Sequence, residues 1–504
     1  MDKELQEAKK EAVERRVERS EKERITNNME KKKKDTKVFY KADFDDLIDI
    51  VLNDDHIKFL TSDQELRDDV TIDGVVYQPP PQTGLPPNLQ IPRSDKVLAY
   101  ARNHDKSGGT GVSGACRGCT LLYKKLLDYH TNISELPDKD LYHLLVIWDF
   151  HTYLIEKANF SPMIYFYSIA ERGKSRTLKG MVNVAFRGIR KGDITDAQLI
   201  RDCTHLRATI AFDMMDFWEK IKNAGSVDVI LNRYERGMTV SRVNRPDRGA
   251  FQDTDYYDVF GPTVLATNEI ISTIADTRAI PIVMIKSDKD FEEEVSPKKA
   301  LPLKEELTAF RLAHYNDPFP SVPKIVKSRL GDITKPLYQI LSLIYPISKE
   351  EYTNIINNTT PIVKTEVRLS THSTFINLIR KIEKTKLVEK IGSIDSDIIQ
   401  AWVDVKGESI GGVLACQLVT TEFNAEKDER EKLSSRRVGN RLKSYGFQPT
   451  TTSNHTLGFF LNDEVLQKLI KEYDLPIDTP SQTPDSPENP ESPEDEADPD
   501  KLPF

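Results

Sequence analysis

The sequence predicts an α/β fold: a parallel-sheet core with a helical lid, then a smaller domain of helices and a β-hairpin, and a disordered acidic tail. Three apolar segments, 163–167, 208–212 and 261–266, predict the core, because each ends in polar residues and a helical pattern follows. Strands that alternate with helices are typical of parallel sheets, whose ligands bind at the carboxyl ends of the strands.

Composition limits the class of protein. Of 504 residues, 38% are hydrophobic and 30% charged, which suits a soluble protein with a large core. The longest apolar stretch, 141–155, is interrupted by Asp149 and His151, and the amino terminus has no secretory signal, so we expect no membrane contact. Four cysteines indicate a reducing compartment, and we expect a cytoplasmic protein. Residues 478–504 hold nine acids and one lysine, so most of the net charge of −9 lies there.

Changes in composition divide the chain into seven segments. They are a charged helical arm (1–40), a small mixed domain (41–125), an α/β core (126–299), a helical lid (300–345), a helical linker (346–404), a domain with a basic helix and a hairpin (405–475) and a proline-rich acidic tail (476–504). In the small domain, 44–52 has helical spacing, and 70–78 predicts a hairpin that turns at Asp73-Gly74.

The segment 161–187 has the order of strand, turn and helix that a phosphate-binding loop requires. Its loop SIAERGKS matches Gly, any four residues, Gly-Lys-Ser/Thr, except that Ser168 replaces the first glycine. In such a loop, backbone N–H groups face an anion, Lys174 reaches the outer phosphates and the Ser175 hydroxyl binds Mg²⁺. We therefore expect ATP and Mg²⁺ as cofactors, with ATP held by Ser168, Arg172, Gly173, Lys174, Ser175 and Arg176.

Polar residues at the ends of the other strands complete the predicted site. Asp213 ends the second apolar segment, where an acid holds Mg²⁺ opposite Ser175. The next residue is often a glutamate that activates the attacking water, but here it is Met214. Either Asp216 or another residue takes that role, or hydrolysis is slow or absent. Asn268 ends the third strand and could orient the water.

A basic segment, 230–249, follows the second strand. It carries Arg233, Arg236, Arg242, Arg245 and Arg248. Two interpretations fit this composition. One is a solvated loop, and the other is a hairpin that binds DNA phosphates through Arg236, Arg242 and Arg245. Farther upstream, Cys116 and Cys119 have the spacing of two zinc ligands, but no matching second pair exists, so ordinary loop thiols are the simpler interpretation.

A second basic segment lies near the carboxyl end. Residues 434–446 predict a helix with Arg436, Arg437, Arg441 and Lys443, and a hairpin and a helix follow it. This order resembles a winged-helix domain, whose second helix typically enters the DNA major groove. Winged-helix domains also bind proteins, so the sequence does not decide between DNA and a protein as the partner of this domain.

Taken together, these parts resemble the AAA+ ATPase module, and more narrowly the MCM-like replicative helicases of plasmids, phages and mobile elements. The segments YERGMTVSRV, FGPTVLATNEI and ADTRAIPI carry the narrower resemblance, which covers about 140–345. It implies that Asn268 senses the γ-phosphate, that Arg278 is a finger reaching a neighbouring subunit's nucleotide, and that Arg329 is a lid arginine contacting the bound one. A finger acting in trans implies a ring, and the resemblance implies that the ring is a hexamer. Ordinary surface ion pairs are the alternative for both arginines.

The tail ends in ADPDKLPF and resembles the carboxyl-terminal tip of bacterial single-stranded-DNA-binding proteins. That resemblance implies that Leu502, Pro503 and Phe504 bind host replication proteins. A solubilising tail, or one that competes with DNA for the protein's own basic surfaces, explains the composition as well.

These features favour an ATP-dependent DNA helicase or translocase, with DNA and copies of itself as partners, that acts in replication of a mobile genetic element. Met214 favours the alternative, an ATP-binding DNA-recognition or loader protein with little hydrolysis. A nucleotide-dependent scaffold is a third option.

Overall fold

The computed structural model describes residues 38–102, 117–268, 273–357, 367–391, 393–425, 427–428, 431–473 and 475. Residues 1–37 of the charged arm, the acidic tail with Leu502, Pro503 and Phe504, and Cys116 lie outside the described residues. The chain forms two compact units, which divide between Glu383 and Lys384. Among the described residues, the structure contains no helix with the length and apolar character that a bilayer crossing requires.

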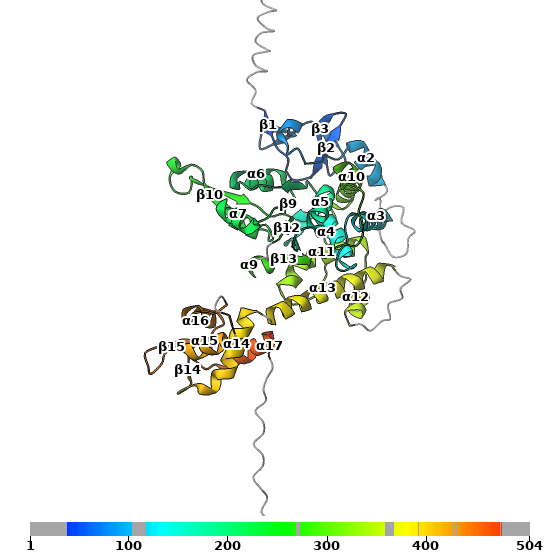
Figure 1. Ribbon diagram of the computed structural model, residues 1–504. Coiled ribbons are helices and arrows are strands. Elements are labelled where there is room, and N and C mark those ends of the chain that lie inside the picture. Colours follow the sequence, from blue (N-terminus) through cyan, green and yellow to red (C-terminus); the bar gives the residue numbers. More distant parts are fainter. Residues whose placement is uncertain are drawn as a thin grey trace, which may run out of the picture. The chain divides into compact units, whose positions relative to one another are not determined.

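The first unit is built on a five-stranded parallel sheet (Figure 1). In spatial order its strands are β13 (Ala279–Val283), β7 (Met163–Tyr167), β12 (Thr263–Thr267), β9 (Ile210–Asp213) and β8 (Ile189–Lys191). The predicted parallel α/β core is thus confirmed. The three central strands are almost entirely buried because helices cover both faces of such a sheet, which explains their continuous apolar sequences.

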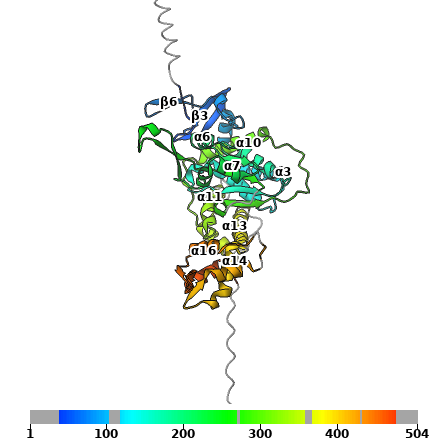
Figure 2. The same cartoon turned by 60° about the vertical axis from the view of Figure 1, so that its left-hand side comes forward.

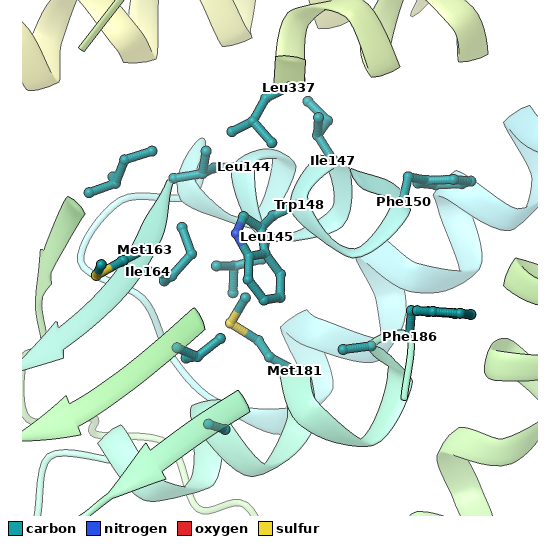
Figure 3. Close-up of a cluster of buried hydrophobic side chains, with 14 of the residues drawn as sticks. Leu144, Leu145, Ile147, Trp148, Phe150, Met163, Ile164, Met181, Phe186 and Leu337 are labelled. Carbon is teal, nitrogen blue, oxygen red and sulfur yellow. The ribbon is translucent and has the colours of Figure 1, made fainter. Parts of the chain in front are cut away.

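Helices α3 (Arg117–Ile133), α4 (Leu141–Tyr153) and α5 (Lys174–Val184) pack beside one another in this unit. Helix α4 is buried nearly all round, so its sequence lacks an amphipathic stripe. Trp148 of α4 lies among Leu145, Ile164 and Met181 (Figure 3), and its indole N–H donates to the carbonyl of Pro162 at 3.0 Å. This packing fixes the strand and the helix that flank the predicted loop.

The amino-terminal strands form two small sheets. One contains β2 (Leu47–Asn53), β3 (His56–Thr61) and β4 (Leu66–Arg67), and the other contains β1 (Phe39–Tyr40), β6 (Val75–Gln78) and β5 (Val70–Ile72). The hairpin that turns at Asp73-Gly74 is confirmed, and both turn residues have positive φ. The helix expected over 44–52 is wrong, because residues 47–52 belong to β2, which pairs antiparallel with β3.

Buried ion pairs and hydrogen bonds fasten these strands to the rest of the first unit. Asp49 of β2 accepts from Arg187 at 2.7 Å, and both side chains are buried. Arg311 of α10 (Pro297–His314) donates to the carbonyls of Leu47 and Ile48. Figures 1 and 2 both show the blue amino-terminal strands next to α10, which also contacts α2 (Ser94–Ala101). Breaking one partner of such a buried pair is costly, so we expect these strands to move with the core.

Three further helices complete the first unit after α10: α11 (Arg329–Ile344), α12 (Lys349–Ile356) and α13 (Val367–Ile391), which crosses into the second unit. The second unit has the order α14 (Ile394–Val405), β14 (Val413–Ala415), α15 (Cys416–Asn424), α16 (Ser435–Ser444), β15 (Pro449–Thr451), β16 (Leu457–Phe460) and α17 (Asp463–Tyr473). Its strands form an antiparallel sheet in the order β14-β16-β15. Trp402 stacks on Phe447 in its core, with ring centroids 4.1 Å apart.

Candidate functional site

The loop between β7 and α5 lies at the carboxyl edge of the sheet. It turns sharply through two residues with left-handed backbone, Glu171 (φ 62°) and Gly173 (φ 77°). Glycine takes this conformation without strain, whereas glutamate does so at a cost of about 1–3 kcal/mol. After the turn, α5 begins at Lys174, so the free backbone N–H groups of its first turn lie beside the loop. This arrangement is the one that binds anions at helix termini.

Lys174 is folded into this loop. Its ammonium group donates to the Ser168 carbonyl at 2.8 Å, to the Ser168 hydroxyl at 3.1 Å and to the Ile169 carbonyl at 2.6 Å. Burial lowers the pKa of Lys174, and the carboxylate of Asp213 opposes that shift. Ser168, which we expect to contact ATP, here accepts a hydrogen bond from Lys174 through its hydroxyl. A glycine at this position, as in the usual loop pattern, would have no side chain to accept that bond.

Ser175 and Asp213 meet beside Lys174. The Ser175 hydroxyl donates to Asp213 Oδ1 at 2.7 Å, although 38 residues separate the two positions. Asp213 ends β9, and the strand register sets it opposite Ala266 of β12. Mg²⁺ prefers oxygen ligands and is usually held by one or two carboxylates together with phosphates and water, so this hydroxyl and this carboxylate suit the ion. Among the described residues, no cluster of three or more His, Cys, Asp or Glu side chains could hold a metal.

Met214 and the nearby acids differ in exposure. The Met214 side chain is buried in the main hydrophobic core, so it cannot take part in chemistry at the loop. Asp216 is exposed at the start of α7 (Phe217–Asn223) with φ 53°. Glu171 is also exposed, on the loop itself. It occupies one of the four positions that the phosphate-loop pattern leaves open, so the pattern assigns it no role.

Asn268 directly follows β12, the strand between β7 and β9. It is exposed, and Thr267 before it is in register with Tyr167 at the start of the loop. The structure therefore brings Asn268 to the same edge of the sheet as Lys174 and Asp213. A polar side chain at this position lies between the phosphate loop and the acid.

The two arginines beside Gly173-Lys174 have different surroundings. Arg172 is partly buried in the loop. Arg176 Nε donates to the carbonyl of Ile133 at 2.5 Å, a second guanidinium nitrogen donates to the carbonyl of Glu293, and the group lies 5.5 Å from the ring of Phe291. These contacts hold Arg176 against α3 and the segment before α10, so we withdraw its assignment to ATP.

Arg278 and Arg329 lie at the opposite, amino-terminal edge of the sheet. The carbonyl of Arg278, just before β13, accepts from the N–H of Met163, the first residue of β7. The Arg278 guanidinium lies 4.8 Å from the Tyr234 ring centroid, and Arg329 donates to the Thr277 hydroxyl at 3.2 Å. A five-residue parallel strand spans about 17 Å, so the two edges of the sheet are about that far apart. The expectation that Arg329 contacts the nucleotide of its own subunit is therefore wrong in this arrangement.

The basic segment forms the hairpin of β10 (Thr239–Val243) and β11 (Thr254–Asp258), as one interpretation predicted. Arg236 donates to the carbonyls of Ile155 and Ala158 at 2.9 and 2.8 Å, and burial lowers its pKa. Arg242 pairs with Asp196 at 2.7 Å and with Asp228 at 3.0 Å. The hydrogen bonds that the Arg242 guanidinium donates to Asp196 and Asp228 raise the pKa of Arg242. These contacts make Arg236 and Arg242 structural, which corrects their assignment to DNA, while Arg245 stays exposed in the connecting loop.

The predicted DNA-binding cations of α16 also include both exposed and ion-paired side chains. Arg436, Arg437 and Lys443 are exposed, whereas Arg441 forms an ion pair with Asp395. Asp395 also accepts from the Tyr445 hydroxyl, so Arg441 ties α16 to α14. Three of the four cations are thus available to a ligand.

Cys119 is buried, and its sulfur lies 3.3 Å from Nε2 of His314, whose Nδ1 contacts Asp317 at 2.7 Å. Its partner in the CxxC pattern, Cys116, lies outside the described residues. Burial of Cys119 in the core supports a structural thiol.

No protein-family model and no curated protein matches the sequence. Among solved structures, the chain is similar to the apo C-terminal region of NrS-1, at 11% identity over 84% of this chain and 95% of that one, with a TM-score of 0.31. It is also similar to the SCCmec type IV active helicase Cch (12% identity, 76% and 71%, TM-score 0.26) and to the JCV helicase (12% identity, 54% and 73%, TM-score 0.25). At these scores, the function of none of these proteins transfers to this chain.

Proposed function

We propose that this chain is an ATP hydrolase of the AAA+ class. More particularly, we infer that it is a DNA helicase or translocase that assembles as a ring of six subunits, as the resemblance implies, and acts in replication of a mobile genetic element. The observation that carries the proposal is the 2.7 Å contact between Ser175 and Asp213 beside Lys174. These three residue types, on a strand–loop–helix and on the neighbouring strand tip, are what ATP and Mg²⁺ require.

Each residue has a role that follows from its position. Lys174 and the backbone amides after Gly173 bind the outer phosphates, and the present bonds from Lys174 to Ser168 and Ile169 are replaced by phosphate oxygens. Ser175 and Asp213 would hold Mg²⁺, and the bound ion would neutralise charge on the phosphates. Asn268 orients the attacking water, and Asp216, exposed after the Asp213 strand, takes its proton.

The two edges of the sheet support a head-to-tail ring. The phosphate loop occupies the carboxyl edge, whereas Arg278 and Arg329 lie at the amino edge. A contact between unlike edges of neighbouring subunits closes into a ring when its rotation allows. Arg278 then stabilises charge on the neighbour's phosphates, and we assign Arg329 to the same neighbouring site. Ile169 and Met215, 68% and 63% exposed after β7 and β9, are apolar groups that such a neighbour would cover.

DNA contact is assigned to two surfaces. One is the hairpin, through Arg245. The other is α16, whose place before a two-stranded hairpin supports a winged-helix domain that presents Arg436, Arg437 and Lys443 to duplex DNA. The tail residues Leu502, Pro503 and Phe504 are proposed to bind a host replication protein.

A second candidate is an ATP-binding loader or DNA-recognition protein with little hydrolysis. Burial of Met214 where a catalytic glutamate is common favours it. The experiment that separates the two measures phosphate release with and without single-stranded DNA. The helicase proposal expects DNA-stimulated hydrolysis by the wild-type chain, and ATP binding without turnover would support the loader instead.

A further inference from the structure

A second cavity in the first unit lies between helix α6 (Asp196–Leu206) and the segments next to the small sheet of β1, β6 and β5. Its volume is about 490 Å³, which is within the usual range for small-molecule sites. Figures 1 and 2 both show α6 next to the blue amino-terminal strands. None of the residues that we place at the ATP site lines this cavity, so it needs an explanation of its own.

Two arginines hold the walls of the cavity in place. The Arg187 guanidinium donates to the carbonyl of Leu206 at 3.0 Å and to the carbonyl of Ala42, and both of these residues line the cavity. The next residue along each wall also takes part, because Arg207 and Asp43 form an ion pair at 2.7 Å. The walls are therefore fixed before a ligand arrives, which lowers the entropic cost of binding.

The acids that line the cavity are already paired. Asp43 pairs with Arg207, and Asp202 pairs with Lys191 at 2.5 Å. Neither of these two cations is among the lining residues. The negative charge of both acids is thus neutralised from outside the cavity, and neither carboxylate is free to hold a metal ion.

The basic residues that line the cavity have no acid of their own. Within the described part of the chain, Lys41, Arg201 and His205 form no ion pair. Arg201 and His205 are exposed and lie one turn apart on α6, and Lys41 comes from the opposite wall. Like charges at one cavity repel each other, and a bound anion offsets that repulsion. A phosphate group suits this set of N–H donors, because charge-assisted hydrogen bonds to phosphate are strong.

The rest of the lining is aromatic and apolar. Tyr40 is 53% exposed, so its ring is accessible, and Pro80, Leu85 and Pro86 add apolar surface. Proline fixes its own backbone φ, so this rim is stiff. An inorganic anion would make no contact of value with these groups. A planar base, by contrast, can stack on the tyrosine and pack against the prolines.

We propose that this cavity binds a free nucleotide, a nucleoside mono- or diphosphate without a metal ion. Lys41, Arg201 and His205 hold the phosphates, and the base stacks on Tyr40. A triphosphate with bound Mg²⁺ suits the cavity less well, because no lining acid is free to face the ion. A nucleic-acid strand is also a poorer fit, since it needs a basic groove that continues from one nucleotide to the next. The inference goes beyond the proposed function and does not depend on it.

The test measures binding of a fluorescent ADP analogue to the full chain in EDTA, with Lys174→Ala in every sample to disable the ATP site. One analogue should still bind per chain. Adding Arg201→Glu should weaken this binding at least about 10-fold, because a charge-assisted contact becomes a repulsion. Tyr40→Leu should weaken it about 10-fold, whereas Tyr40→Phe should keep it, because a phenyl ring still stacks. Arg102→Glu, at an exposed arginine that follows α2, is the matched control and should have no effect.

Equal affinity of the Lys174→Ala chain with and without Arg201→Glu would overturn the site. Displacement of the analogue by inorganic phosphate as effectively as by ADP would overturn the base contact. Equal displacement by a short 5′-phosphorylated oligo-dT strand would overturn the free nucleotide as the ligand.

These results are independent of the ATP site, which is disabled in every sample. ATP hydrolysis by the wild-type chain, together with no effect of Arg201→Glu on analogue binding, would remove only this inference. Analogue binding that depends on Arg201, in a protein whose wild-type chain neither binds nor hydrolyses ATP, would remove only the proposed function.

Discussion

The Ser175 hydroxyl donates a 2.7 Å hydrogen bond to Asp213, joining the first turn of α5 to the end of β9. The bond depends on the parallel order β7-β12-β9, which sets the loop after β7 and the acid after β9 at one edge with a single strand between them. The same order brings Asn268 to that edge.

Asp213→Asn should allow ATP binding but lower turnover about 100-fold, because it removes the charge that holds Mg²⁺. The asparagine oxygen can still accept from Ser175, so the melting temperature should stay within about 2 °C. Phosphate release and binding of a fluorescent ATP analogue measure the two effects. Normal turnover by this variant would disprove the metal role.

The proton acceptor is tested by comparing two acids at the same edge. Asp216→Asn should lower kcat about 100-fold or more, as is typical for loss of a general base, and leave ATP affinity unchanged. Glu171→Gln should retain turnover within a factor of about 3. If the glutamine variant is the inactive one instead, the loop acid is the base and the assignment of Asp216 is wrong.

Arg278→Ala should reduce hydrolysis without weakening ATP binding, because the finger acts on a neighbour's nucleotide. Mixing it with Lys174→Ala subunits should restore part of the activity, since some interfaces then pair an intact loop with an intact finger. Tyr234→Leu removes the ring that Arg278 contacts and controls for lost packing. Mixtures no more active than their separate components would argue against a shared site.

Charge reversal on α16, with Arg436→Glu, Arg437→Glu and Lys443→Glu combined, should weaken duplex binding and lower the log–log salt slope by about 3. Lys468→Glu and Lys471→Glu reverse two exposed lysines on α17 of the same unit, and the loss of affinity per reversed charge is compared between the two sets. If both sets weaken binding equally, the effect is general electrostatics, and α16 has no special role.

Much of the core could be predicted, because buried parallel strands leave continuous apolar sequences and the loop pattern requires a strand before it and a helix after it. Periodicity failed over 44–52, where the apolar spacing also suits a helix. Asp49 in that segment is buried only because Arg187, 138 residues away, pairs with it.

Contacts between side chains that are distant in the sequence could not be predicted for the basic hairpin either. Sequence reasoning found its arginines but could not tell which ones have partners, since those partners are Asp196 and Asp228 and the carbonyls of Ile155 and Ala158. Arg329 was assigned to the wrong edge because its place depends on how α11 packs.

The most direct test of the central claim is ATP binding, with Mg²⁺ present, by the wild-type chain and by Lys174→Ala. The account predicts that the variant binds at least about 100-fold more weakly, since about 3 kcal/mol of charge-assisted contact is lost. Lys179→Ala, on the same helix but paired with Glu294, should bind as the wild type does. Equal ATP affinity for Lys174→Ala and the wild type would contradict the account.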